Sequence, residues 1–535
     1  MNEGDPGRAG ESCRAAADEL HRRGDLPGAI AAYEQAVALD ATNLPAWWGL
    51  GCATLTRGDY AASAASLARV VAIEPGHGQA RHNLGKALFH LGQIDAALEA
   101  FREAAAVLEP PDQALATIAT IIPGSPLADN RAVIDARRSW ARVAAPGTGR
   151  TKTFRHRPDD PDGRIRIGYL SSFFEYPNWM KPVWGLINRH DRDQFEVHLF
   201  SDAPRADIEH GYSGHPDDRF HDVTQLSNAE TARLIEAQTI DVLVDLNGYS
   251  RIARLPVLAL RPAAVQVAWF NMFAPSGLDC FDYLIGDSHV LPEGDAAERI
   301  YTERIVRVPG SHLTFEVTYP VPDVAPAPCL SRGALTFGCL SPQYKITPQV
   351  VEAWSRILRA CPACRLFLKN GVLDSASNRR FVQDQFARLG VPADRLALEG
   401  RADHLTYLGA YAQVDVVLDP FPYNGGTTTM EALWQGVPVL TFEGDRWASR
   451  ISTSLMRNAG LSEFVAANVD DYIAQAIDLA NTAGTPARLD ELRRTMRDRL
   501  RQSPVCDVGA FAREMERAYM RMWRRYVDGR SSDST

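Results

Sequence analysis

The segment from Asp419 to Pro438 holds residue types that suit the binding of a phosphate group. A predicted strand ends at Asp419, two prolines stiffen the exit, and Asn424-Gly425-Gly426 forms a turn ahead of a predicted helix. That helix begins with Thr427, Thr428 and Thr429, and backbone N–H groups and hydroxyls at a helix N-terminus bind a diphosphate well. Simple N-capping by the threonines is the alternative. Three consecutive threonines exceed what capping needs, so we favour a phosphate site. Glu431, one turn further along the helix, suits a ribose hydroxyl pair.

Other nucleotide-binding and metal-binding motifs are missing from the sequence. There is no GxxxxGKS or GxxxxGKT loop, and no GxGxxG follows the first predicted strand. Cys361 and Cys364 form a close pair, but a structural zinc site needs four ligands and no second pair matches them. The two Asp-x-Asp matches, 160–162 and 191–193, fall in predicted loops outside the half that carries the threonine motif. We therefore expect no metal and no cofactor beyond a nucleotide co-substrate.

The elements that must position the threonine motif alternate between short strands and helices from Arg164 onward. Strands are predicted over 164–170, 195–201, 240–248, 266–270 and 282–286, and, after a proline-rich linker at 319–328, over 335–340, 365–369, 396–400, 414–419 and 437–442. Such alternation is typical of parallel strands wrapped by helices. We predict two doubly wound, Rossmann-like α/β halves, with the ligand cleft at the carboxyl ends of the strands.

The first 110 residues are a repeat with a period of 34 residues. The pairs Gly24-Asp25, Gly58-Asp59 and Gly92-Gln93 are 34 residues apart, and Tyr33, Leu67 and Phe101 follow the same step. A helix–turn–helix period of this length, with small residues where helices cross, is the tetratricopeptide signature. Three units, about residues 10 to 109, make a minimum stable stack. The groove of such a solenoid holds a peptide or protein partner. The alternative is a scaffold or self-association surface that gives a homo-oligomer.

Two helices and a linker complete the chain. A charged amphipathic helix is predicted over 130–143, and the stretch 145–163 reads as a linker because it is rich in Pro, Gly, Asp and Arg. With this linker and a self-contained repeat stack, we expect the repeats to be separable from donor binding. The C-terminal helix, 510–527, carries an aromatic stripe that predicts packing into the core rather than membrane binding.

Composition excludes several classes of protein. The 535 residues include 57 basic and 66 acidic ones, a net charge of −9 that argues against a nucleic-acid protein held by phosphate contacts. Eight cysteines at long, irregular spacings are typical of a reducing compartment. No apolar signal segment and no run of about 20 apolar residues is present. We expect a soluble, cytoplasmic, multidomain protein with no membrane span.

From Ile165 to about Ala480 the chain resembles the O-linked N-acetylglucosaminyltransferase family, whose bacterial members join tetratricopeptide repeats to a GT-B catalytic unit. The segments that carry the resemblance are Gly168–Ser172, Asp245–Tyr249, Arg261–Val267, Gln343–Ile346, Asp419–Pro438 and Ala448–Arg450. The helix at 129–141 also resembles the bridge of the family between repeats and catalytic unit. The resemblance implies a tetratricopeptide solenoid followed by an α/β GT-B fold.

The resemblance also implies roles for single residues. Lys345 matches the lysine that contacts the donor diphosphate, and a cation facing a helix N-terminus would stabilise a leaving nucleoside diphosphate; the alternative is a solvated surface lysine. His404 matches a histidine near the uridine, or is an ordinary surface histidine. The expected donor-binding set is Gln343, Lys345, His404, Asn424, Gly425, Gly426, Thr427, Thr428 and Glu431. Many bacterial members carry histidine where this chain has Gly426.

The N-terminal half departs from the family pattern. The segment after Gly168-Tyr-Leu-Ser-Ser contains no histidine before Pro182, and 271–277 reads Asn-Met-Phe-Ala-Pro-Ser-Gly where many members have Gly-Tyr-Pro-Gly-Thr. These changes leave both the sugar and the general base open. The groups left in this half are Glu175, Lys181, Asp245, Asn247 and His312. Glu175 could act as base and Lys181 could touch phosphate or orient the acceptor; the alternative for each is an ordinary loop charge.

These observations predict a metal-independent protein O-glycosyltransferase that moves a sugar, N-acetylglucosamine from UDP-GlcNAc, to Ser or Thr of a protein held by the repeats. The alternatives are a non-catalytic repeat scaffold with a degenerate transferase half, or a transferase that uses another nucleotide sugar, as in flagellin or surface-protein glycosylation. The predicted catalytic residues are Lys345, Glu175 and Lys181. The predicted domains are the repeats (10–122), a linker with the bridging helix (123–163), the acceptor-side half (164–318), the donor half (329–505) and the C-terminal helix and tail (506–535).

Overall fold

The computed structural model describes residues 6–146, 163–176, 178–205, 211–294 and 296–533. The chain forms two compact units. The first comprises Met1–Leu127, Pro328–Phe421 and Val469–Pro486, and the second comprises Ala128–Ala327, Pro422–Asn468 and Ala487–Thr535. Most of the predicted linker, 147–162, and the Asp160-Pro-Asp162 match lie outside the described residues.

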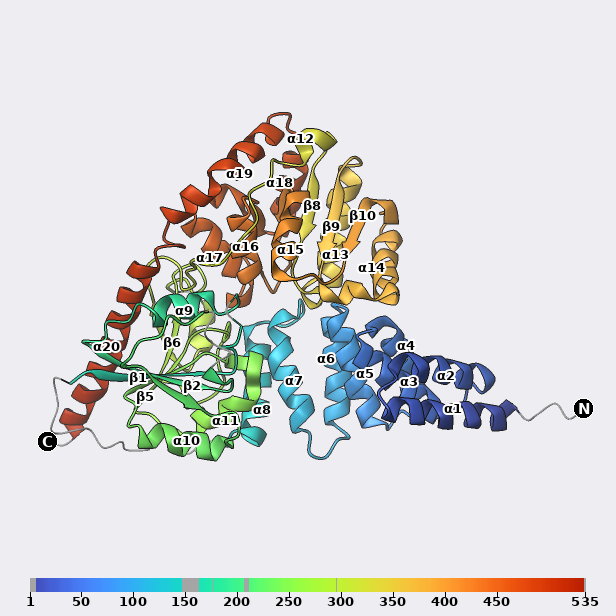
Figure 1. Cartoon of the computed structure of the whole chain (residues 1–535), viewed down its shortest axis with the longest axis horizontal. Helices are drawn as coiled ribbons and strands as arrows, with labels where there is room; N and C mark the ends of the chain where they lie inside the picture. Colours follow the sequence, from blue (N-terminus) through green and yellow to red (C-terminus); the bar gives the residue numbers. More distant parts are fainter. Residues whose placement is uncertain (1–5, 147–162, 177, 206–210, 295, 534–535) are drawn as a thin grey trace, which may run out of the picture. The chain divides into compact units, whose positions relative to one another are not determined.

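The first unit opens with three helical pairs, shown in blue at the start of the chain in Figure 1. They are α1 (Pro6–Arg22), α2 (Leu26–Leu39), α3 (Leu44–Arg57), α4 (Tyr60–Ile73), α5 (Gly78–His90) and α6 (Ile94–Ala105). Each pair turns at a glycine of the 34-residue period, and Gly24, Gly58 and Gly92 have φ angles of 81°, 80° and 81°. Glycine adopts this left-handed conformation at little cost. The predicted tetratricopeptide stack is confirmed.

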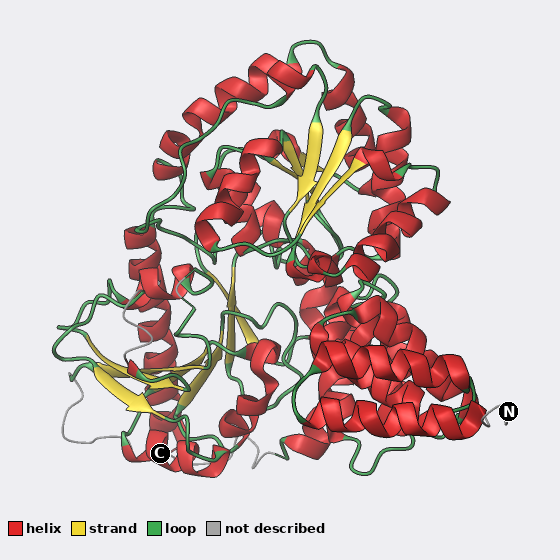
Figure 2. Cartoon of the chain, turned by 45° about the vertical axis from the view of Figure 1, so that its right-hand side comes forward, coloured by secondary structure: helices red, strands yellow, loops and turns green. Residues whose placement is uncertain are grey.

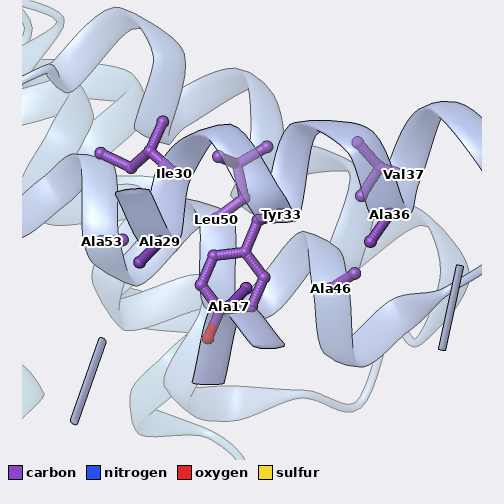
Figure 3. Close-up of a cluster of buried hydrophobic side chains, with 9 residues drawn as sticks. All are labelled: Ala17, Ala29, Ile30, Tyr33, Ala36, Val37, Ala46, Leu50 and Ala53. Carbon is purple, nitrogen blue, oxygen red and sulfur yellow. The ribbon is translucent and has the colours of Figure 1, made fainter. Parts of the chain in front are cut away.

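Small residues let neighbouring helices of the repeats approach closely. A Cβ atom at Gly49 would lie 2.3 Å from the Tyr33 ring, and one at Gly85 would lie 2.9 Å from the Phe101 ring. Figure 3 shows the Tyr33 ring among the buried side chains of α1, α2 and α3. The Tyr33 hydroxyl donates to Asp18 Oδ1 at 2.6 Å, so this ring is satisfied at its polar end as well. Helix α7 (Asp112–Ile121) and a short 3-10 turn, η1 (Ile122–Gly124), complete the helical part of the unit.

The rest of the first unit is α/β. Its parallel strands are β8 (Thr336–Cys339), β9 (Arg365–Lys369), β10 (Leu396–Glu399) and β11 (Val416–Leu418), and its helices are α12 (Cys329–Arg332), α13 (Pro348–Ala360), α14 (Ala376–Arg388), α15 (His404–Gly409) and α18 (Val469–Asn481). Strand β8 lies between β9 and β11. Residues 336–339 of β8 are fully buried, as expected for a central parallel strand.

The repeats pack directly on this α/β part. Asn378 of α14 is buried, donates to Gly58 O at 2.8 Å and accepts from Ala61 N at 2.9 Å. The hydroxyls of Ser375 and Ser377 donate to Asp59. Backbone groups of the second repeat are thus satisfied by α14 rather than by water. That the repeats are separable from donor binding stays a prediction.

The second unit contains a parallel sheet of seven described strands in the order β3-β2-β1-β4-β5-β6-β7. The strands are β1 (Ile165–Ser171), β2 (Phe195–Ser201), β3 (Arg219–Asp222), β4 (Val242–Asp245), β5 (Val265–Ala268), β6 (Tyr283–Gly286) and β7 (Arg304–Arg307). Gly168 of β1 pairs with His198 of β2 and with Leu243 of β4. Figure 2 shows strands flanked by helices. The helices of this part that Figure 1 labels include α9 (Lys181–Ile187), α10 (Asn228–Ala237) and α11 (Leu255–Ala259).

The remaining elements of the second unit are α8 (Asn130–Ala144), α16 (Thr427–Trp434), β12 (Val439–Phe442), α17 (Ile451–Asn458), β13 (Val465–Ala466), most of α19 (Thr485–Arg501), and α20 (Val508–Asp533). Strands β12 and β13 pair in parallel with one another. Two parallel α/β sheets after a helical repeat confirm the predicted fold class.

The two long helices at either end of the second unit are held by buried contacts. In α8, the predicted bridging helix, Arg137 is 2% exposed and donates to Pro275 O at 2.8 Å. In α20, Phe511 packs against Trp269, with ring centroids 5.8 Å apart, and Glu516 accepts from the backbone N–H of Asp191 at 2.8 Å. The prediction that the C-terminal helix packs into the core is confirmed. No helix in the described part of the chain is long and apolar enough to cross a membrane.

Candidate functional site

The threonine motif forms a helix start of unusual geometry in the second unit. Gly426 is the N-cap of α16, with φ −126° and ψ −84°, and no side chain caps the helix. Two hydrogen bonds hold the loop before this helix. The Asn424 N–H donates to Ala448 O at 2.9 Å, in the segment before α17, and the hydroxyl of Ser452, in α17, donates to Gly425 O at 3.1 Å. The simple capping alternative is therefore wrong: the threonines lie in the first turn and do not cap it.

Only two of the three threonines face outward from this turn. Thr427 and Thr428 are half-buried, whereas Thr429 is buried and its hydroxyl is 2.9 Å from that of Ser452. The first turn of a helix presents N–H groups that have no acceptor within the helix. A half-buried turn with two hydroxyls and these N–H groups suits an anion such as a phosphate.

Glu431 and Lys181, which the sequence placed in separate roles, form a buried ion pair. Lys181 Nζ lies 3.2 Å from Glu431 Oε1, and the two side chains are 4% and 7% exposed. Burial lowers the pKa of Lys181, and the Glu431 carboxylate offsets part of that effect. The ammonium also lies 5.2 Å from the centre of the Tyr319 ring. Lys181 therefore holds the Glu431 carboxylate in place. If Glu431 binds ribose hydroxyls, it does so while paired with Lys181.

Lys345 occupies the carboxyl edge of the sheet in the first unit. It ends the 3-10 turn η6 (Gln343–Lys345), which follows β8, and it is half-buried. Burial lowers the pKa of Lys345 to about 8, while Asp419, just after β11, and Cys339, the last residue of β8, act in the opposite direction. The adjacent ends of β8 and β11 thus place a partly desolvated cation where parallel α/β sheets bind ligands.

Two more expected donor residues lie near this edge in the first unit. Gln343 is buried, and its Oε1 accepts from Asn370 Nδ2 at 3.3 Å. His404 is the first residue of α15, is half-buried, and lies parallel to Tyr407 with centroids 6.3 Å apart. The Tyr407 hydroxyl donates to Leu340 O at 3.0 Å, which ties α15 to the loop that leads to Lys345. Sequence reasoning missed Tyr407, for which the spacing His404-x-x-Tyr407 on a helix was an available signal.

The N-terminal candidates lie in different surroundings. Glu175 is exposed, and its hydrogen bond with Tyr176 raises the pKa of that phenol. Asp245 is buried at the end of β4, accepts from the N–H groups of Asn247 and Gly248 at 3.2 and 2.8 Å, and has its pKa raised to about 7 by burial. The Asn247 side chain accepts from Ser172 N at 2.7 Å and so ties the ends of β4 and β1 together. Asp245 is thus fully enclosed, whereas Glu175 lies at the surface.

The comparisons with known proteins cover most of the chain. The family described as Glycosyl transferase family 41 matches residues 129–317 and 328–515. The chain belongs to glycosyl transferase family 41. Its N-terminal part also matches two families described as TPR repeat (17–58) and Tetratricopeptide repeat (54–119).

Individual relatives of this family 41 chain carry transferase names. It is 34% identical over 383 residues to a probable UDP-N-acetylglucosamine–peptide N-acetylglucosaminyltransferase SPINDLY of Hordeum vulgare, covering 70% of this chain and 40% of that one. It is 28% identical over 376 residues to a probable enzyme of the same activity, SEC of Arabidopsis thaliana, covering 68% and 38%. The chain thus spans about 40% of the length of the curated relatives it matches.

A solved structure resembles this family 41 chain over nearly its full length. It is that of a lysine-to-methionine mutant of the Thermobaculum terrenum O-GlcNAc transferase, with a TM-score of 0.81 and 33% identity, covering 99% of this chain and 100% of that one. The resemblance expected from the sequence is therefore confirmed at the level of family and fold.

One buried cluster in this family 41 chain was only partly anticipated. His312 Nδ1 lies 2.6 Å from Asp287 Oδ2, and the Ser454 hydroxyl donates to the same oxygen at 2.7 Å. These contacts, with hydrogen bonds from the backbone, lower the pKa of Asp287. The cluster joins the end of β6 to α17, whose Ser452 contacts the Gly425 loop. His312 thus supports the threonine motif indirectly, through α17. The position of Asp287 directly after a strand was the feature of the sequence that could have pointed to this cluster.

In the described part of the chain, the residue types that bind metals are not gathered into a metal-binding cluster. Among the described residues, no group of three His, Cys, Asp or Glu side chains is arranged to hold a metal ion. Cys361 and Cys364 are buried free thiols, and burial raises the pKa of Cys364 to about 11. Asp191 and Asp193 lie in the turn before β2, where the Asp191 carboxylate accepts from Asp193 N at 2.9 Å. That hydrogen bond gives Asp191 a structural role in the turn.

Proposed function

We propose that this protein transfers a sugar from a nucleotide sugar to Ser or Thr hydroxyls of a protein, with UDP-GlcNAc as donor and the repeats holding the acceptor. The observation that carries the proposal is the first turn of α16, where Thr427 and Thr428 are half-buried and the N-cap is Gly426. Membership of glycosyl transferase family 41 and the names of the relatives support it.

The proposed chemistry relies on positioning and electrostatics. Thr427, Thr428 and the N–H groups of α16 bind the diphosphate, and Lys345 neutralises the charge that grows on it as the sugar–phosphate bond breaks. His404 contacts the uracil and Glu431 the ribose. Glu175 is the proposed general base, because it is exposed and so can be reached by an acceptor hydroxyl, whereas Asp245 is fully buried.

No metal ion or further cofactor takes part in the proposed reaction. The cation Lys345 and the N-terminus of α16 take the place that a divalent ion occupies in other transferases. We place the activity in the cytoplasm, because all eight cysteines are free thiols. A full-strength reaction in excess EDTA supports metal independence, and a reaction abolished by EDTA and restored by Mg²⁺ contradicts it.

A second candidate keeps the reaction but changes the sugar. The segment 271–277 departs from the family pattern, and its Phe273 ring approaches the Tyr423 ring with centroids 6.3 Å apart, next to the Asn424 loop. Bulky rings at this point favour a donor sugar of different shape. The discriminating experiment measures UDP or GDP release from a panel of nucleotide sugars with the full-length chain. Release from UDP-GlcNAc alone supports the first candidate, and release from another sugar supports the second.

A complete lack of turnover and of nucleotide binding in that panel would instead support the non-catalytic scaffold. Thermal unfolding gives the binding readout, because a ligand that binds only the folded protein raises the unfolding temperature.

A further inference from the structure

The third repeat rests on the turn that carries Lys345. Phe89, in α5, lies parallel to Tyr344 of η6, with ring centroids 4.8 Å apart and planes 18° apart. Tyr344 directly precedes Lys345, and burial raises the pKa of Tyr344 to about 12, so its hydroxyl stays protonated. An aromatic side chain of the repeats thus packs one residue away from the expected catalytic cation.

A second contact at the same corner involves the backbone. A Cβ atom on Gly92 would lie 2.2 Å from Ile346 O and 3.1 Å from Gln343 O. The backbone of the repeat therefore approaches residues on both sides of Lys345 as closely as only glycine permits. Gly24, at the corresponding corner of the first repeat, has the same φ of 81° but would place its Cβ in open space. The left-handed turn alone requires glycine at both positions, whereas the contact with η6 is particular to Gly92.

The corner is held in place by the neighbouring repeat. The Tyr60 ring of α4 stacks on the His90 ring of α5, with centroids 4.2 Å apart and planes 15° apart. The same repeat is bonded to α14 through Asp59 and Asn378. The second and third repeats therefore form a continuous support that begins at α14 and ends at η6.

The backbone of the turn has the hydrogen bonds of a single 3-10 turn. Lys345 N donates to Pro342 O at 3.0 Å and Ile346 N donates to Gln343 O at 2.9 Å, which are the bonds of one 3-10 turn. A group that stabilises developing charge must be held to within a fraction of an ångström by its surroundings.

We propose that Phe89 and Gly92 are positioning residues for Lys345, so that the repeats set the turnover of the donor in addition to holding the protein acceptor. The inference rests on the proposed function, in which Lys345 meets the diphosphate. It predicts that damage at this corner lowers turnover even when no protein acceptor is present.

The test compares Gly92→Ala with the matched control Gly24→Ala in the full-length chain. Both substitutions place alanine at a positive φ, but only the first displaces Ile346. The measurement is UDP release from the nucleotide sugar without acceptor, with the unfolding temperature recorded in parallel. We expect Gly92→Ala to lower kcat on the order of tenfold or more, and Gly24→Ala to stay within about twofold of the wild type. Equal kcat values for the two variants would overturn the proposal.

A second pair of variants leaves the backbone unchanged. Phe89→Ala removes the ring that covers Tyr344, and Phe89→Tyr keeps it. We expect the alanine variant to lose turnover and the tyrosine variant to recover most of it. Trp48→Ala is the control, because Trp48 packs on His77 within the repeats, with centroids 4.9 Å apart, away from η6. A loss of turnover in Trp48→Ala equal to that in Phe89→Ala would mean a general structural role and would overturn the proposal.

A double-mutant cycle separates this inference from the proposed function. If Phe89 acts through Lys345, adding Phe89→Ala to Lys345→Ala produces little further loss, and the two effects are not additive. Additive effects would overturn the positioning role while leaving Lys345 in its place. A Lys345→Ala variant with wild-type turnover would overturn the role of Lys345, and with it the inference. Absence of turnover in the wild-type chain with every nucleotide sugar would refute the proposed function itself.

Discussion

Lys181 Nζ lies 3.2 Å from Glu431 Oε1, and both side chains are buried although 250 residues separate them in the sequence. Glu431 lies in the second turn of α16, directly behind the threonines, and Lys181 is the first residue of α9. The pair thus links the start of α9 to the helix that carries the expected phosphate site.

Breaking this pair from one side should destabilise the protein. Lys181→Met leaves the Glu431 carboxylate buried without its counter-charge, and we expect a loss of about 3–5 kcal/mol in the free energy of unfolding. Adding Glu431→Gln to this variant removes the uncompensated charge and should restore much of the loss. Urea unfolding of the two variants and the wild type measures both effects. A single variant as stable as the wild type would show that the pair contributes nothing.

Lys345→Ala should lower kcat far more than it raises KM for the donor. The charge of Lys345 is worth most once negative charge has begun to grow on the leaving oxygen, in a site where water screens poorly. By analogy with the loss of one oxyanion-stabilising donor, we expect a decrease on the order of 100-fold, or ~3 kcal/mol. Steady-state kinetics with the nucleotide sugar measures it. Turnover within about threefold of the wild type would show that Lys345 lies outside the reaction.

Thr428→Ala should show the opposite kinetic pattern. Its hydroxyl would hold the phosphate in the ground state and in the transition state alike, so its loss raises KM with a smaller effect on kcat. Thr429→Ser is a suitable control. The Thr429 hydroxyl is bonded to that of Ser452, and serine keeps this hydroxyl on a smaller side chain. A large fall in kcat with an unchanged KM for Thr428→Ala would contradict the expected binding role.

The pH dependence of kcat/KM should report Lys345. Burial brings the pKa of Lys345 to about 8, and only its ammonium form stabilises a leaving diphosphate, so activity falls as the pH rises through about 8. The nearby Asp419 opposes this lowering of the pKa of Lys345 more strongly than Cys339 does. Lys345→Arg keeps its charge at higher pH and should move the decline upward by more than about one pH unit. The same decline near pH 8 in the arginine variant would assign it to another group.

Asn378→Ala should weaken the attachment of the repeats to α14. The side chain satisfies Gly58 O, Val372 O and Ala61 N, and its removal leaves these backbone groups unpaired at a buried position. We expect a loss of about 2–4 kcal/mol in the free energy of unfolding. Asn130→Ala, at a half-exposed helix start, is the control and should change stability by less than about 0.5 kcal/mol. Limited proteolysis should then release the repeats from Asn378→Ala and leave the control intact; equal resistance in both would contradict a role of Asn378 in docking.

The sequence by itself determined the local architecture and the family. The 34-residue spacing of Gly24, Gly58 and Gly92 specifies three left-handed corners. Each corner needs one residue with a positive φ, and glycine adopts that conformation at little cost. Central strands such as β4 were predicted because a parallel strand buried on both faces is a continuous apolar run. The edge strands β3 and β7 were missed: their residues, Arg219–Asp222 and Arg304–Arg307, are half-exposed and charged, so no apolar pattern marks them.

The tertiary structure decided which of these elements meet. Glu431 and Lys181 were each predicted to touch substrate, but the packing of the second unit pairs them with one another. No feature of the sequence indicated that Phe89 contacts Tyr344. The predicted linker also gave no indication that Asn378 of α14 bonds to the second repeat. Helix phase and strand register follow from neighbours in the sequence. Contacts between residues hundreds of positions apart depend instead on the shape and polarity of whole surfaces, which form only when the elements have folded together.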